Sequence, residues 1–94
     1  MIATLKSKNV TINGRRTSLR LEQISWDAMA DICKSEGMTI HELCSLIENR
    51  RGGSSRTSAV RAFIVSYYRA AAAEYGILQK GIASSVLPQL AARS

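Results

Sequence analysis

The sequence predicts a mainly α-helical fold with a short β-ribbon near its N-terminus. The segment Arg15–Leu21 alternates between polar and apolar residues, and three segments with helical periodicity follow it between residues 23 and 75. Because successive side chains of an extended chain point to opposite faces, Thr17, Leu19 and Leu21 share one side of the predicted strand. The order of elements is therefore one strand followed by three helices.

The other side of this strand carries Arg16, Ser18 and Arg20. One face suits a hydrophobic core, and the other suits an anion. A single strand leaves its backbone hydrogen bonds unmet, and a second copy of the same strand is the simplest partner. A chain of 94 residues also buries only about 60–65% of its unfolded surface, so an added interface is expected to stabilise it. These points predict a homodimer.

Residues 1–14 are predicted to be either a basic N-terminal arm or a hairpin strand. The first eight residues show no strong pattern and favour a mobile arm. Asn13 and Gly14, however, form the dipeptide that best suits a two-residue type I′ hairpin turn. If the hairpin forms, Val10 lies opposite Thr17 and Ile12 lies opposite Arg15, which puts the apolar side chains of both strands on one face. The sequence leaves the two alternatives open.

Two helices are predicted after the strand. The first runs from Gln23 to Glu36 and ends at Gly37, and its apolar stripe is Trp26, Met29, Ala30 and Cys33, with Ile32 beside it. The second begins after Thr39, because Thr39 and Glu42 have the spacing of a capping box. It is expected to end near Asn49, before a loop that contains Arg50, Arg51 and two glycines.

A third helix is predicted from a cap at Ser54 or Ser55 to about Tyr75. Its apolar stripe is expected to pack into the core and consists of Val60, Phe63, Ile64, Tyr67, Tyr68 and Ala71. The C-terminal tail, residues 77–94, has a weak apolar segment interrupted by Pro88. It is either a docking segment or disordered, and the sequence does not decide between them.

Composition favours a folded, basic protein. Hydrophobic content of 46% argues against global disorder, and a net charge of +6 with an isoelectric point near 9.9 favours a polyanionic partner. No apolar run approaches the ~20 residues needed to span a bilayer, so a cytoplasmic protein without a membrane partner is expected. Cys33 and Cys44 lack the spacing of metal ligands and are expected to be buried free thiols.

Catalysis is not expected from this sequence. It has no glycine-rich phosphate loop of the usual spacing and no local signature of a Ser/His/Asp arrangement. We therefore predict no enzyme activity, no catalytic residues, no metal site and no cofactors. His41 is interpreted as a surface residue, and the basic loop that contains Arg50, Arg51 and Arg56 as a solvent-exposed loop or, less simply, as a second phosphate contact.

The order of elements resembles that of the ribbon-helix-helix family of DNA-binding proteins, which includes Arc-like and MetJ-like repressors. The resemblance is carried by Arg-Thr-Ser-Leu-Arg-Leu-Glu at residues 16–22, by Trp26, by the Glu-Gly-Met-Thr turn at 36–39 and by Arg-Arg-Gly-Gly at 50–53. It is closest to the small bacterial ribbon-helix-helix domains with an added C-terminal helix, and it extends to about Tyr68. The domain with its third helix is expected over residues 15–76.

The resemblance implies a mechanism of DNA recognition. In the family, strands from two chains pair antiparallel, and their outward residues enter the major groove. Here these base-contacting residues would be Arg16, Ser18 and Arg20. The start of the second helix would contact phosphate through the backbone at Thr39, Ile40 and His41. Arginine is also the usual bidentate reader of guanine, which supports the assignment on chemical grounds.

The sequence therefore predicts a homodimeric transcriptional regulator, most simply a repressor, with double-stranded DNA as its partner. The alternative is an antitoxin or protein-interaction module that binds a protein partner through the C-terminal region, residues 77–94. A third possibility is a structural or adaptor dimer that has kept the fold without binding DNA.

Overall fold

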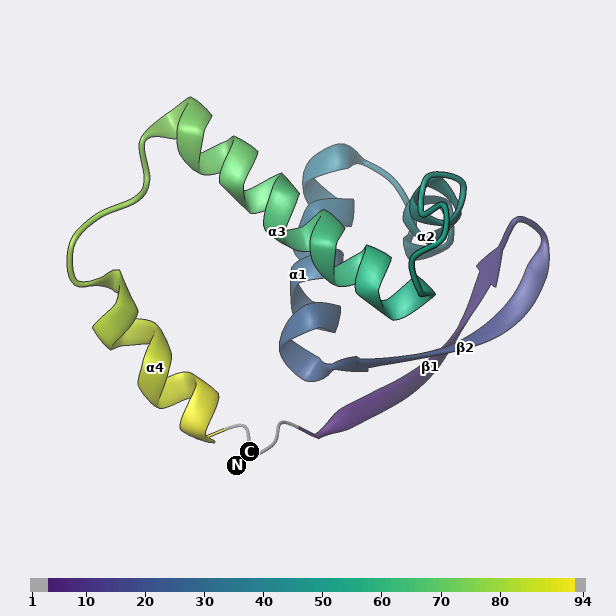
Figure 1. The fold of residues 1–94 in the computed structure, drawn as a ribbon, viewed down its shortest axis with the longest axis horizontal. Coiled ribbons are helices and arrows are strands. Elements are labelled where there is room, and N and C mark those ends of the chain that lie inside the picture. Colours follow the sequence, from purple (N-terminus) through teal and green to yellow (C-terminus); the bar gives the residue numbers. More distant parts are fainter. Residues whose placement is uncertain (1–3, 93–94) are drawn as a thin grey trace.

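The computed structural model describes residues 4–92 and has the predicted fold class, a β-ribbon followed by helices (Figure 1). Its elements are β1 (Leu5–Ile12), β2 (Arg15–Glu22), α1 (Gln23–Glu36), α2 (Ile40–Glu48), α3 (Arg56–Tyr75) and α4 (Ile82–Ala92). The hairpin packs against α1 and α2, α3 begins beside α2 and passes in front of α1, and α4 stands apart from the core on the left of this view. The three predicted helices are confirmed, with α1 beginning and ending at the predicted residues.

The ribbon within one chain is an antiparallel hairpin of β1 and β2. Val10 lies opposite Thr17, which is the register expected for the hairpin alternative. Asn13 and Gly14 have φ angles of 50° and 81°, the positive values that a type I′ turn requires at both positions. The hairpin, which the sequence left open, is therefore confirmed, and the premise that β2 has no partner strand in its own chain is wrong.

The predicted mobile arm is also wrong where the structure describes it, since β1 begins at Leu5; residues 1–3 lie outside the described part of the chain. The indole Nε1 of Trp26 donates to the carbonyl oxygen of Lys6 at 2.9 Å, and the Lys8 ammonium lies 5.2 Å from the centre of the indole ring. A residue of α1 thus holds the first half of β1 in place. Local sequence cannot reveal such a contact, because the residues are about 20 positions apart.

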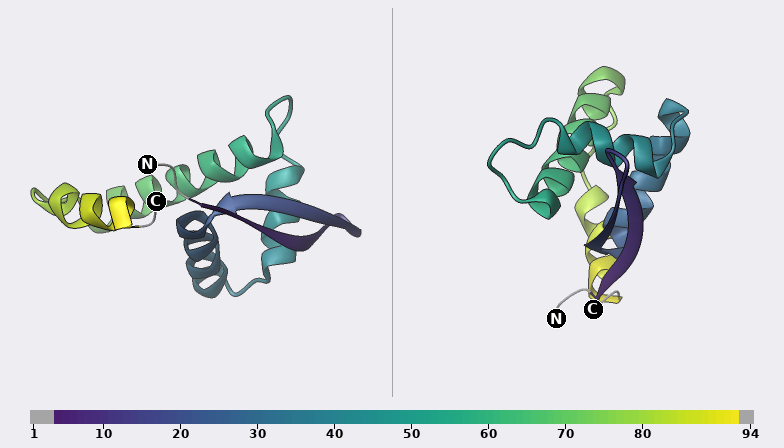
Figure 2. Two further views of the ribbon diagram at one scale, coloured as in Figure 1. Left: turned by 90° about the horizontal axis from the view of Figure 1, so that it is seen from below. Right: turned by 90° about the vertical axis from the view of Figure 1, so that its right-hand side faces the viewer.

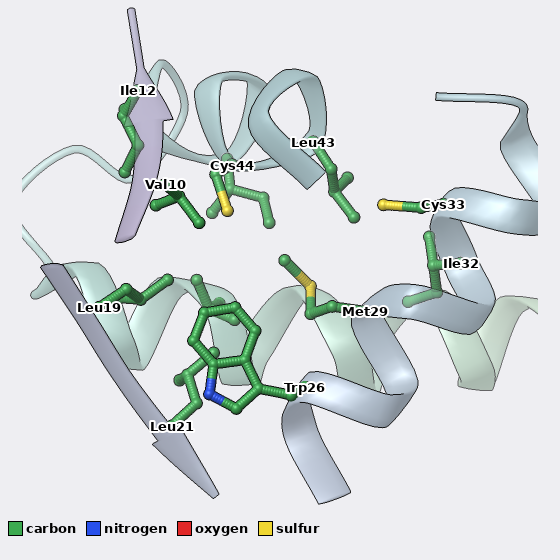
Figure 3. Packing of buried hydrophobic residues seen from close by; sticks show 12 residues of the cluster. Val10, Ile12, Leu19, Leu21, Trp26, Met29, Ile32, Cys33, Leu43 and Cys44 are labelled. Atoms are coloured by element: carbon green, nitrogen blue, oxygen red, sulfur yellow. The ribbon is translucent and has the colours of Figure 1, made fainter. Parts of the chain in front are cut away.

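One hydrophobic core joins the inner face of the hairpin to three helices (Figure 3). Leu21 and Met29 are fully buried, and the central part of the cluster comprises Val10, Ile12, Leu19, Leu21, Trp26, Met29, Ile32, Cys33, Leu43, Cys44, Ile47 and Val60. Ile32, predicted only to flank the stripe of α1, is buried, whereas Ala30 is exposed. The stripe follows the i, i+3, i+4 spacing from Met29 to Ile32 and Cys33.

The helix ends follow the predicted signals. The Glu42 amide donates to Thr39 Oγ1 at 3.1 Å, and the Thr39 amide donates to Glu42 Oε1 at 2.8 Å, which completes the capping box of α2. Ser55 caps α3 by accepting the Ser58 amide at 3.2 Å. Gly76 ends α3 in the left-handed conformation.

The two tyrosines of α3 differ in their packing. Tyr67 packs against the core, and its hydroxyl donates to Glu36 Oε2 at 2.7 Å. Tyr68 is 39% exposed, so its predicted place in the packed stripe is wrong. Consecutive residues of a helix point in directions about 100° apart, so the face that brings Tyr67 to the core turns Tyr68 towards solvent.

The C-terminal segment forms a helix, α4, that includes Pro88. Proline removes one hydrogen bond to the preceding turn, which explains why the sequence did not indicate a helix here. The side chains of Ile82, Val86 and Leu87 remain exposed. The structure thus favours an ordered helix over disorder in residues 82–92, and it leaves the docking role a proposal.

Cys33 and Cys44 are buried free thiols, as predicted. Burial raises the pKa of the Cys44 thiol to about 11, which keeps it neutral at physiological pH. None of the helices in the described residues is both long and apolar enough to cross a bilayer.

Candidate nucleic-acid interface

The two faces of the hairpin differ sharply in chemistry. Leu19 and Leu21 point into the core and are 2% and 0% exposed, whereas the side chains that alternate with them on β2 are exposed. Directly opposite residues of an antiparallel pair share a face. The pairing register therefore adds three residues of β1 to the exposed side. We call this set the outer face, and it consists of Ser7, Asn9, Thr11, Arg16, Ser18 and Arg20.

The six side chains of the outer face make no hydrogen bond or ion pair with the side chains of residues 4–88 or with the backbone of residues 4–92. The nearest carboxylate along β2 is engaged elsewhere: Glu22 Oε2 accepts from Arg61 Nη2 of α3 at 2.8 Å. The hydrogen bonds from Arg61 lower the pKa of Glu22, so the carboxylate stays ionised and is held beside α3. Both guanidinium groups of the outer face are consequently available to an external anion.

The two edges of the hairpin also differ. The Thr11 amide donates to His41 Nδ1 at 2.9 Å, and the Asn13 amide donates to Ser45 Oγ at 2.9 Å. Side chains of α2 thus bond to the outer edge of β1 near the turn, and both views of Figure 2 place α2 beside this part of the hairpin.

The outer edge of β2 is open. Because the Thr11 amide points away from β2, the alternation of an antiparallel ladder directs the backbone groups of its opposite residue, Arg16, away from β1. The backbone groups of Ser18 and Arg20 also point away from β1, because these residues lie two and four positions further along the strand. Nothing in the described chain bonds to these amides and carbonyls, so the residues that carry the exposed side chains also form an unpaired strand edge.

The start of α2 lies beside the turn end of β1. The capping box occupies the Thr39 and Glu42 amides, and the Leu43 amide bonds to the Thr39 carbonyl. The amides of Ile40 and His41 are the first two of the helix and have no partner in residues 4–92. His41 Nδ1 accepts from Thr11, so Nε2 carries the ring proton and can donate.

Sequence reasoning identified the residues of β2 and of the α2 start, but it missed the three polar residues of β1: Ser7, Asn9 and Thr11. The signal that could have found them is the Asn-Gly turn. Counting back from that turn in a two-residue hairpin gives the register that places Asn9 opposite Ser18.

Two of the three arginines in the basic loop between α2 and α3, Arg51 and Arg56, are paired with a carboxylate of the same chain. Arg56 makes two hydrogen bonds to Glu48, at 2.8 and 3.1 Å, and Arg51 Nε lies 3.0 Å from Glu48 Oε1. Arg56 in particular lowers the pKa of Glu48 to about 2. These arginines therefore tie the loop to α2, and of the three, Arg50 is the one that is exposed without such a partner.

A short ribbon with an exposed basic face, followed directly by two capped helices, defines a protein of the ribbon-type nucleic-acid-binding class. The family model described as a ribbon-helix-helix domain matches residues 5–68, and the chain belongs to this family. The family is one of DNA-binding regulators that generally bind DNA as dimers, and its fold is not enzymatic. The match begins at the first residue of β1. Neither the curated proteins nor the solved structures include a match to the chain.

Proposed function

We propose that the protein is a sequence-specific DNA-binding transcriptional regulator that reads the major groove with Arg16, Ser18 and Arg20. The observation that carries this proposal is the outer face itself, with exposed side chains that have no partner in the described chain. Arginine pairs in bidentate fashion with guanine O6 and N7, and serine can bond to either class of base. The family provides the general DNA-binding role, and the unpaired residues provide the specific contacts.

The DNA-binding form is proposed to be a homodimer in which β2 of each chain pairs antiparallel with β2 of its partner. The open edge at Arg16, Ser18 and Arg20 supports this pairing, because exposed strand edges bind other strands readily. The argument for a homodimer therefore rests on the unpaired outer edge of β2, and no longer on a strand without any partner. The melting temperature of the homodimer should rise with protein concentration.

Phosphate contacts are proposed at the start of α2 through the amides of Ile40 and His41, whereas the Thr39 amide, which donates to Glu42 Oε1, is not available and Thr39 acts as the helix cap. The free amides of Ile40 and His41 and the positive end of the α2 dipole favour an anion at this position. The Thr11–His41 hydrogen bond holds the start of α2 next to the ribbon, so both could contact one duplex.

The test compares Arg20→Ala with Arg69→Ala, a matched variant that removes the same charge from an exposed position of α3. Each variant is titrated at two salt concentrations with two duplexes, one selected for binding to the unaltered protein and one of random sequence. Arg20→Ala should cost about 1–3 kcal/mol per lost base contact on the selected duplex and relax the preference at one position of each half-site. Arg69→Ala should change neither duplex appreciably. An equal loss on both duplexes for Arg20→Ala would show a merely charged face and refute direct readout.

A second candidate function is binding of a protein partner through the C-terminal region. The observation that favours it is α4, a helix without charged residues whose side chains Ile82, Val86 and Leu87 are exposed. A Leu87→Asp chain should keep its affinity for DNA and lose a partner that co-purifies with the unaltered chain. If both chains purify with the same proteins, or with none, this candidate fails.

A further inference from the structure

The outer face carries a second row of hydrogen-bonding side chains, on β1, beside the proposed base-reading residues of β2. Ser7, Asn9 and Thr11 of β1 lie opposite Arg20, Ser18 and Arg16 respectively. All three side chains of β1 are exposed, uncharged and without a partner among the residues described.

The position of this row relative to DNA follows from the spacing between strands and the width of the major groove. If β2 pairs with its copy, each β2 lies about 2.4 Å and each β1 about 7 Å from the two-fold axis, because neighbouring strands are about 4.8 Å apart. The major groove is about 12 Å wide, so its walls lie about 6 Å from the same axis. The β2 pair therefore fits between the walls, and each β1 lies over a phosphate backbone.

The residue types agree with this position. Serine, threonine and asparagine are short donors that commonly bond to phosphate and allow the protein backbone to come close to the DNA backbone. The two guanidinium groups, which have the reach and geometry to read bases, occur on β2 alone. The start of α2, bonded to Thr11 through His41, lies on the far side of β1 and extends the same row away from the axis.

We propose that Ser7, Asn9 and Thr11 of β1 are phosphate-binding residues that flank the groove and set the depth of the ribbon without reading bases. This inference rests on the proposed function, since it assumes a β2-to-β2 dimer on a duplex. It assigns the hairpin strand β1 a role in DNA binding that differs in kind from that of β2.

The test is Asn9→Ala, titrated on the selected and the random duplex at several salt concentrations beside Arg20→Ala. Loss of one phosphate hydrogen bond per chain should weaken both duplexes alike, by roughly 5- to 30-fold. The slope of log K against log salt should stay unchanged, because an uncharged side chain releases no counterion. Asn9→Ser keeps a donor and should recover part of the affinity, whereas Asn9→Asp should bind more weakly than Asn9→Ala. Ser7→Ala provides a second variant should Asn9→Ala perturb the hairpin.

Three outcomes would overturn the inference, and they are distinguishable. If Asn9→Ala alters the preferred sequence, β1 reads bases and the hairpin of one chain fills the groove. If Asn9→Ala and Ser7→Ala change neither duplex while Arg20→Ala behaves as a base reader, β1 lies away from DNA and the proposed function survives. If the unaltered chain binds no duplex, or Arg20→Ala has no effect, the proposed function fails together with the inference.

Discussion

The hairpin and α4 occupy opposite ends of the chain and differ in how firmly each is attached to the core. The hairpin is rich in lysine and arginine, yet Val10, Ile12, Leu19 and Leu21 are at most 4% exposed. The helix α4 has no charged residue, yet Leu87 is 61% exposed. Alternation gathers these four apolar side chains of the hairpin on one face, and the helices cover that face. Attachment therefore depends on where apolar side chains point and what covers them, and not on how many an element contains.

The largest expected effect is a difference in stability when a leucine is replaced by alanine in the hairpin and in α4. Leu21→Ala should lower the free energy of unfolding by about 2–5 kcal/mol, because it leaves a cavity in the packed core. Leu87→Ala should change it by less than about 0.5 kcal/mol, because the side chain is exposed. Urea denaturation at one fixed protein concentration measures both. Equal losses would place α4 in the core and remove the contrast.

Within the well-packed region, the Glu48–Arg56 pair should make stability depend on pH. The pKa of Glu48 is about 2 in the folded chain, below its ordinary value of 4.5. The contribution of the ionised carboxylate is therefore complete above about pH 4.5 and is lost as the pH falls towards 2. Glu48→Gln should cost about 1–2 kcal/mol at pH 7, and this cost should shrink steadily below pH 4.5.

The control for this prediction is Glu74→Gln, an exposed carboxylate of α3 that is expected to leave the unfolding curve unchanged at pH 7. A Glu48→Gln cost that stays constant from pH 7 to pH 2.5 would show that the charged pair is not its source.

A smaller effect is expected at the two capped helices. Thr39→Ala and Ser55→Ala each remove a side-chain cap and should each cost about 0.5–2 kcal/mol of stability. Only Thr39→Ala should also weaken DNA binding, because the start of α2 is the proposed phosphate contact and the start of α3 is not. Thermal unfolding combined with duplex titration separates the two effects. Equal DNA affinity for the two variants would argue against phosphate binding at α2.

Most of the fold could be predicted from the sequence because its signals are local. The capping box at Thr39 and Glu42, the glycines that end α1 and α3, and the alternation of β2 each lie within a few residues of the feature that they specify. The direction of Arg16, Ser18 and Arg20 followed from the parity of the strand alone. The family could be identified from the same segments.

The parts that could not be predicted depend on contacts between distant residues. The first half of β1 is held by Trp26, and the outer edge of β1 is covered by His41 and Ser45. Ala30 and Ile32 were ranked wrongly because the core takes the face of α1 that meets the hairpin, and not every apolar position of the helix. Pro88 argued against a helix locally, although α4 forms around it.

The central claim, that Arg16, Ser18 and Arg20 of the outer face read bases in the major groove, is tested most directly by methylation interference on a selected duplex. Guanine N7 lies in the major groove and adenine N3 in the minor groove, so dimethyl sulfate probes both. If Arg16 and Arg20 bind guanine, N7 methylation should abolish binding at symmetrically placed guanines in the two half-sites, and N3 methylation of adenine should leave it intact. Interference from adenine N3 alone, or from no guanine in the site, would contradict the account.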